Sequence, residues 1–252
     1  MVKNWDNNHI PESKLNEARN LVEELTNSLK PFAQEVEDGN YANSVLDGVF
    51  PIEGIKFVRL NHYHLLMNDS ANLNYYVTKA RSELEMEFFH YMAAEEMNHV
   101  NGLFLLTDAM GISRKELMSS YPNSMCLFRT NYFSRLALYG TPGEIALGIL
   151  LNFPVWAAGV RKESAGLKKH YGFGKPVKGT DKLDTDILDR FLSATAEETS
   201  GFNEKAIKII ARDLQDNSSK TKLSLVAKWA VETEKLVWDN YYAQGLKYAK
   251  NK

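Results

Sequence analysis

Helical periodicity runs through almost the whole of this 252-residue chain and constrains its fold more than any other feature. Apolar residues recur three or four positions apart in segment after segment, which places them on one face of a helix. Residues 11–30, for example, carry Leu15, Leu21, Leu25 and Leu29 on one stripe. We find no convincing strand, internal repeat or linker. The sequence therefore predicts an all-α protein.

Prolines and glycines suggest where the predicted helices begin and end. Pro31 should stop the first helix, and a second helix should cover residues 51–68. Residues 74–111 are interpreted as one long third helix that Gly111 ends. Further helices are expected over residues 113–122, 122–140, 141–172, 184–214 and 219–250, with one loop at residues 172–184.

The segment from residue 141 to 172 is apolar nearly all round, which is typical of a central, buried helix. Thr141 is placed to cap it, with Pro142 in the first turn and Glu144 at the third helical position. Pro154 should kink the helix or shift its register. Trp156 could line a cavity, although core packing is the simpler role.

Composition indicates one domain and excludes several classes of protein. Hydrophobic residues make up 44%, charged residues 25%, and the net charge is −2, so nothing indicates binding to nucleic acid or acidic lipid. No apolar run reaches the roughly 18 residues needed to cross a membrane. A single cysteine, Cys126, suits a reducing compartment. We expect a cytoplasmic, single-domain protein over residues 1–252, with residues 1–40 as an N-terminal helical extension.

The stretch "AAEEMNHVNG", residues 93–102, carries the strongest chemical signal. Glu96 and His99 stand three apart, so on a helix they share a face and could present two metal ligands. The alternative is a solvated glutamate beside a hydrogen-bonded core histidine. A two-metal bundle site needs a second such pair, yet the only histidine after His99 is His170, at a predicted helix end. Cys126 sits in no nucleophile motif and is better interpreted as a small buried hydrophobe.

Three stretches together resemble the heme-oxygenase-like superfamily. They are "DGVFPIEGIKFVRLNHYHL", "EEMNHVNGLFLLTDAMGIS", and "GLKKHYGF" followed by "LDRFLSATAEETSGF". The superfamily includes the TenA/thiaminase II proteins, PqqC and the heme-oxygenase-like di-iron oxidases, and the resemblance covers about residues 40–245. It implies a compact bundle of about seven or more helices around a central pocket, a small-molecule substrate and a homodimer.

Compared with the di-iron oxidases, the chain keeps only part of the ligand set. The resemblance aligns ligands with Glu96, His99 and Glu198, and puts His62 where the oxidases carry a carboxylate. The other ligand positions are occupied by Phe153, Ala194 and Gly201. A full two-iron site is therefore not expected. At most one iron or manganese ion is implied, held by His62, Glu96, His99 and Glu198, a mixture of histidine and carboxylate ligands that suits non-heme iron.

The TenA and PqqC comparisons lead to different chemistry. The catalytic cysteine of TenA falls near Phe153, its following tyrosine at Ala157, and its aspartate near His62, whereas its late glutamate has a counterpart in Glu234. Without that thiol, covalent thiamin cleavage lacks its nucleophile. PqqC uses dioxygen without a metal, and this chain could build a comparable pocket from His62, Tyr63, His99, Trp156, Glu198 and Glu234.

The sequence analysis thus predicts an oxidoreductase that acts on a small organic substrate, with one metal ion or none. One alternative is a TenA-like thiamin or pyrimidine salvage hydrolase, and another is a bundle that binds a ligand or partner without catalysis. The predicted catalytic residues are His62, Tyr63, Glu198 and Glu234. The predicted pocket-lining residues are Phe153, Trp156, Ala157 and Ala194.

Overall fold

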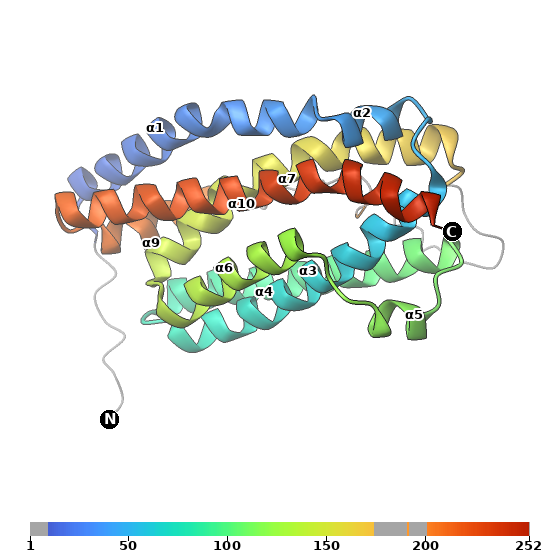
Figure 1. Cartoon of the computed structure of the whole chain (residues 1–252). Helices are drawn as coiled ribbons and strands as arrows, with labels where there is room; N and C mark the ends of the chain where they lie inside the picture. Colours follow the sequence, from blue (N-terminus) through green and yellow to red (C-terminus); the bar gives the residue numbers. More distant parts are fainter. Residues whose placement is uncertain (1–9, 174–190, 192–200, 252) are drawn as a thin grey trace.

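The computed structural model describes residues 10–173, Phe191 and residues 201–251. All elements in that part are helices, which confirms the all-α prediction. The long helices lie side by side, with α1, α7 and α10 in the upper half of Figure 1 and α3, α4 and α6 in the lower half. In chain order, the helices are α1 (Glu12–Glu37), α2 (Asn40–Leu46), α3 (Ile52–Lys79), α4 (Glu83–Ala109), α5 (Arg114–Ser119), α6 (Ser124–Tyr139), α7 (Pro142–His170), α9 (Phe202–Asp213) and α10 (Asn217–Lys250).

Helix α7 is the central element, as its all-round apolar sequence predicts. It packs against α1, α2, α9 and α10. By length and composition it could cross a membrane, but 72% of its most apolar window is buried inside the bundle. Its apolar surface therefore serves the packing of the core. The helix also runs without interruption through Pro154.

The predicted caps at two helix ends are confirmed. Thr141 accepts a hydrogen bond from the backbone N–H of Glu144, whose carboxylate accepts one from the backbone N–H of Thr141, so α7 begins with a complete capping box. Gly111 follows the end of α4 with φ 73°, a left-handed conformation that glycine adopts without strain.

Two predicted boundaries are wrong. Residues 74–111 do not form one helix, because α3 ends at Lys79 and α4 begins at Glu83. Ser82 caps α4 by accepting from the backbone N–H of Glu85 at 3.3 Å. The pair Ser82 and Glu85 has the spacing of a capping signal that the analysis of periodicity overlooked.

Pro31 does not end the first helix. It lies inside α1, which continues to Glu37. The side of the helix that carries Pro31 is exposed, so water can hydrate the carbonyl that loses its backbone partner. The buried residues of α1, including Leu15, Leu21 and Leu25, belong to the main hydrophobic core, so α1 is an integral part of the bundle.

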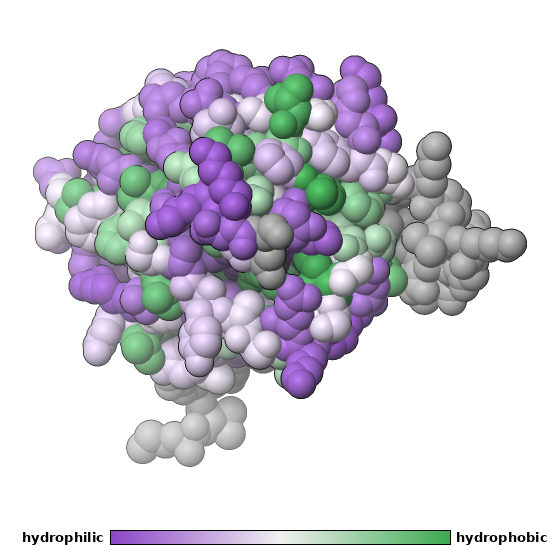
Figure 2. Space-filling view, turned by 45° about the vertical axis from the view of Figure 1, so that its right-hand side comes forward, coloured by the Kyte–Doolittle hydropathy of each residue, from purple (hydrophilic) through white to green (hydrophobic). Residues whose placement is uncertain are grey.

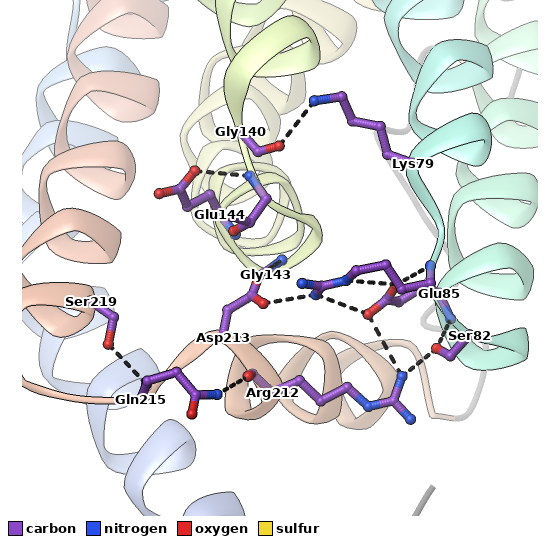
Figure 3. Close-up of polar contacts among 12 residues, drawn as sticks. Lys79, Ser82, Glu85, Gly140, Gly143, Glu144, Arg212, Asp213, Gln215 and Ser219 are labelled. Atoms are coloured by element: carbon purple, nitrogen blue, oxygen red, sulfur yellow. Dashed lines mark hydrogen bonds and ion pairs between the residues drawn. The ribbon is translucent and has the colours of Figure 1, made fainter. Parts of the chain in front are cut away.

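Charged side chains connect three helix ends at one end of the bundle (Figure 3). Arg81, just before α4, donates to Asp213 Oδ1 at 2.7 Å and to Glu85 Oε1 at 3.2 Å. Asp213, at the end of α9, also accepts from the backbone N–H of Gly143 at 2.6 Å. Glu85 is fully buried and lies 3.6 Å from Arg212. This network stabilises the packing of α4, α7 and α9.

The face of the molecule drawn in Figure 2 mixes hydrophilic residues with small groups of hydrophobic ones. Several large hydrophobic side chains of the described chain are exposed on α6 and α10. They are Leu127, Phe128, Leu138, Tyr139, Leu225, Trp229 and Leu236.

Candidate functional site

A cavity of about 460 Å³ lies inside the bundle, lined by residues of α1, α3, α4, α6, α7, α9 and α10. This volume is within the range of small-molecule sites. Most of its wall is apolar. The polar and charged side chains that line it are Thr26, His62, Asp69, Asn72, Glu95, Glu96, His99, Arg129, Asn152, Asn203 and Glu234.

Arg129 on α6 is the central cation of the cavity wall and is only 6% exposed. Its Nη1 donates to both carboxylate oxygens of Asp69 on α3, at 3.0 and 2.8 Å. Its Nε donates to Glu234 Oε2 on α10, at 2.6 Å. One buried guanidinium thus holds carboxylates from two other helices.

Glu234 is fixed by further partners and is 2% exposed. Asn152 on α7 donates to Glu234 Oε2 at 3.3 Å, and the indole N–H of Trp238 donates to Oε1 at 3.0 Å. Both carboxylate oxygens therefore already accept hydrogen bonds. This arrangement holds the carboxylate of Glu234 in one orientation and suits it to position other groups.

Asp69 is a partly buried carboxyl group whose pKa is raised into the neutral range. Burial raises its pKa to about 7, the charge of Glu96 adds to that rise, and Arg129 opposes it. The carboxyl of Asp69 can therefore gain or lose a proton near neutral pH.

Glu96 and His99 lie one turn apart on α4, and both line the cavity. Glu96 Oε2 is 3.4 Å from His99 Nδ1, while Glu96 Oε1 is buried and has no hydrogen-bond partner among the residues that the structure describes. Burial lowers the pKa of His99, but the hydrogen bond and charge of Glu96 outweigh it, and the resulting pKa is raised. The imidazole ring also packs 5.4 Å from the ring of Trp156, centroid to centroid.

A buried carboxylate oxygen without a partner is costly. A ligand that donates a hydrogen bond to Glu96 Oε1 would remove that cost. The pair can also move a proton between the carboxylate and the imidazole.

His62 on α3 lines the same cavity and is 6% exposed. Its ring centroid lies 5.8 Å from that of Phe191. Burial lowers the pKa of His62 well below its ordinary value, and the positive charges of Arg59, His99 and Arg129 lower it further. His62 is therefore a neutral imidazole at physiological pH.

The other predicted site residues fall into three groups. Phe153 and Trp156 line the cavity, with ring centroids 5.4 Å apart. Tyr63 and Ala157 do not line it. The ring of Tyr63 packs near those of His64 and Phe104 instead, because the residue after His62 projects from a different side of α3. Ala157 is buried in the core, on a side of α7 that does not reach the cavity. Ala194 and Glu198 lie outside the described residues.

The predicted metal site is incomplete in the described part of the chain. Among residues 10–173, 191 and 201–251, no three histidine, cysteine, aspartate or glutamate side chains are grouped closely enough to hold an ion. His62, Glu96 and His99 alone thus do not form a metal site, and the fourth predicted ligand, Glu198, is not described. Gly201, at another ligand position of the di-iron group, precedes α9 with φ 100°.

Cys126 does not supply a nucleophile to the cavity. Its side chain is fully buried and is not part of the cavity wall. Burial raises the pKa of the thiol to about 12, so it stays protonated at neutral pH. This confirms its interpretation as a small buried hydrophobe.

Three residues of the site were missed in the sequence: Asp69, Arg129 and Asn152. Asp69 follows His62 by two helical turns and shares its face, so the spacing could have revealed it. Arg129 and Asn152 come from other helices, and only the packing of the bundle brings them to Glu234.

Comparison with known proteins identifies the family of this chain. The model of the TENA/THI-4/PQQC family matches residues 28–244. A search of curated protein sequences found no match.

Solved structures share the fold at low sequence identity. A TenA homologue from P. horikoshii OT3 is 16% identical with a TM-score of 0.68, and the match covers 89% of this chain and 99% of that one. A TenA homologue from Pyrococcus furiosus is 15% identical with a TM-score of 0.66, over 88% and 100% of the two chains. A putative TenA-like thiaminase from Sulfolobus solfataricus P2 is 12% identical with a TM-score of 0.58, over 88% and 97%. At this identity the structures support the fold alone. The family model covers most of the chain, and the chain therefore belongs to the TENA/THI-4/PQQC family.

Proposed function

We propose that this chain is an enzyme that converts a small cyclic organic molecule in the central cavity by general acid–base catalysis. Glu96 and His99 are the proton-transfer pair, and Asp69 is a second proton donor or acceptor. Arg129 and Glu234 hold Asp69 and the cavity wall in place. The single observation that carries the proposal is the buried Oε1 of Glu96 in the cavity wall, which has no hydrogen-bond partner in the described part of the chain, because a catalytic base needs a free lone pair that faces its substrate.

The lining of the cavity supports a substrate with an apolar ring. Leu65, Leu66, Ile149 and Leu150 contribute to the apolar wall, together with the ring of Trp156. A flat ring packs well against such side chains. The few charged side chains can then orient polar groups on the ring. In most small-molecule sites, apolar walls bind the ligand and a small number of polar groups fix its orientation.

Oxidation by dioxygen is the first candidate reaction. It needs a substrate that loses a proton to a base, and Glu96 with His99 provides that base. Dioxygen is apolar and would partition into the largely apolar cavity. This is the oxidoreductase function predicted from the sequence, in its metal-free form.

Hydrolysis of an aminopyrimidine or of thiamin is the second candidate. Family membership and the similarity to the putative TenA-like thiaminase from Sulfolobus support it at least as well as they support oxidation. Glu234, which the resemblance aligns with the late glutamate of TenA, lies in the cavity wall. The described part of the cavity offers no thiol, so a hydrolase of this kind would activate water directly through a carboxylate.

One experiment separates the two reactions. Purified protein is incubated with thiamin, 4-aminopyrimidines and related small heterocycles, in air and under nitrogen, and products are identified by mass spectrometry. Oxidation requires air and consumes dioxygen, whereas hydrolysis proceeds equally under nitrogen. A ligand that binds in the cavity and is never converted would instead favour a binding protein, the non-catalytic alternative.

A single iron or manganese ion remains a prediction that depends on Glu198. Metal analysis of protein grown with added iron tests it, together with loss of that metal in the His99→Ala variant. Our proposed acid–base steps do not pass through a metal.

Cellular location and assembly also remain predictions. We propose a cytoplasmic homodimer that binds a small molecule and neither nucleic acid nor membrane. The exposed hydrophobic side chains of α6 and α10 support an interface with a second copy, and sedimentation equilibrium tests it.

A further inference from the structure

Arg59 and His62 make a buried contact on α3, next to the cavity. Arg59 Nη1 lies 3.3 Å from His62 Nδ1, and the two residues are 2% and 6% exposed. A guanidinium stays protonated and carries only hydrogen-bond donors. Nδ1 of His62 must therefore accept, so it carries a lone pair and no proton.

The guanidinium of Arg59 is held in one orientation by two other helices. Its Nη2 donates to the buried carboxylate of Glu163 on α7. The hydroxyl of Tyr41 on α2 donates to the same oxygen, Oε1 of Glu163. If Arg59 turned away, Glu163 would be left as a buried charge without its counter-ion, which is strongly unfavourable. The donor that faces His62 is thus fixed by the fold.

The second ring nitrogen of His62 must then carry the proton. A ring whose Nδ1 carries a lone pair is a neutral imidazole, and its one N–H is then on Nε2. Within the described part of the chain, no hydrogen bond uses Nε2, and His62 lines the cavity.

We infer that Arg59 fixes His62 in the Nε2–H tautomer, so that His62 offers the cavity a hydrogen-bond donor. In this state His62 is not a general base, because its only lone pair is engaged by Arg59. It also cannot ligate a metal through Nε2 until that proton leaves. His62 is a specificity-determining residue. Arg59 is the positioning residue that makes Nε2 of His62 a hydrogen-bond donor and not an acceptor.

A consequence for the ligand follows, and it rests on the proposed function. The group that contacts His62 must be an acceptor, such as a carbonyl oxygen or an unprotonated ring nitrogen. The group that contacts Glu96 Oε1 must be a donor. The cavity therefore selects a ring with a donor and an acceptor at separate positions.

The tautomer can be measured without a substrate. The full chain is labelled with ¹⁵N-histidine, and long-range ¹H–¹⁵N correlation spectra at pH 7 distinguish protonated from unprotonated ring nitrogens. The chain has six histidines, and the His62→Gln variant identifies the signals of His62. We expect a protonated Nε2 and an unprotonated Nδ1. A proton on Nδ1, or on both nitrogens, would overturn the inference.

Two variants test the role of Arg59. Arg59→Lys retains a charged donor and should keep the Nε2–H tautomer. Arg59→Met combined with Glu163→Met removes the donor and its counter-ion together, and should give a mixture of tautomers. An unchanged Nε2–H tautomer in the double variant would show that Arg59 is not the cause. If the double variant does not fold, the wild-type and Arg59→Lys spectra still decide the tautomer. None of these spectra depends on turnover, so the inference and the proposed function can fail separately.

Discussion

Replacing Arg129 by methionine should destabilise the protein strongly at pH 7 and much less at pH 5. The substitution keeps an unbranched side chain but leaves Asp69 and Glu234 without the cation that they share. Removing one partner of a buried ion pair costs about 3–5 kcal/mol. Asp69 can escape part of this cost by taking up a proton near neutrality, so the cost falls mainly on Glu234, which is 2% exposed.

The pH dependence follows from the same charges. Burial raises the pKa of Asp69 to about 7 even beside Arg129, which opposes that rise, so without Arg129 the pKa of Asp69 in the folded state should lie still further above its unfolded value. The folded variant then binds more protons than the unfolded chain, so its stability falls as pH rises and recovers as pH is lowered. The difference between Arg129→Met and the wild type should therefore shrink between pH 7 and pH 5.

Urea denaturation at the two pH values measures this effect. At pH 7 the melting temperature should also fall by about 6–20 °C, since 1 kcal/mol corresponds to roughly 2–4 °C in a chain of this size. Lys205→Met is the matched control, because its ion pair with Glu87 is exposed and should contribute less than about 1 kcal/mol. Our reasoning is refuted if Arg129→Met loses under about 1 kcal/mol, or loses the same amount at both pH values.

Three further predictions concern the packing of the bundle. Glu85→Ala should cost about 1–3 kcal/mol in chemical denaturation, because it removes the buried acceptor that Arg81 and Arg212 share, while Arg81 keeps its ion pair with Asp213. An effect under about 0.5 kcal/mol would mean that Glu85 contributes little to the network in Figure 3. Gly166→Ala should cost about 1–3 kcal/mol or more, since an added Cβ would lie 2.1 Å from the backbone oxygen of Val45. The control is Ala165→Ser, a change at the exposed neighbouring residue, which should stay within about 0.5 kcal/mol. Equal effects of the two substitutions would contradict the close approach of α2 and α7. Cys126 should react with a thiol reagent only on unfolding, because its side chain is fully buried, and rapid labelling of the native protein would be inconsistent with that burial.

Much of the fold was predictable from local patterns. The periodicity of apolar residues identified the helices, and the capping box at Thr141 marked the start of α7. Local patterns failed where two principles compete. Apolar periodicity continues across residues 80–82, so it predicted one continuous helix in spite of the capping signal at Ser82. At Pro31 the helix tolerates the lost backbone hydrogen bond because that side of α1 faces solvent.

The candidate site was predictable only in part. Glu96 and His99 were visible because both lie on one helix, one turn apart, and their spacing is set by the helix itself. Arg129 could not be found in this way. Its role depends on the approach of α3, α6 and α10, and no spacing within one segment encodes a contact between Arg129 and Glu234, which are 105 positions apart.

The resemblance to known families supplied Glu234 and the cavity, and it also suggested Tyr63 and Ala157, which the structure places elsewhere. Residues carried over from a family by position are reliable for the backbone. They are less reliable for the direction of a side chain, because one position along a helix turns the side chain by about 100°.

The central claim is that Glu96 transfers a proton in the cavity, and its most direct test compares two glutamine variants on α4. Glu96→Gln keeps the shape of the side chain and removes the base, while Glu87→Gln removes an exposed carboxylate outside the cavity. With the substrate found in the turnover screen, Glu96→Gln should lower kcat by about 100-fold or more, with ligand binding retained, and Glu87→Gln should match the wild type. A Glu96→Gln variant with wild-type kcat would contradict the account.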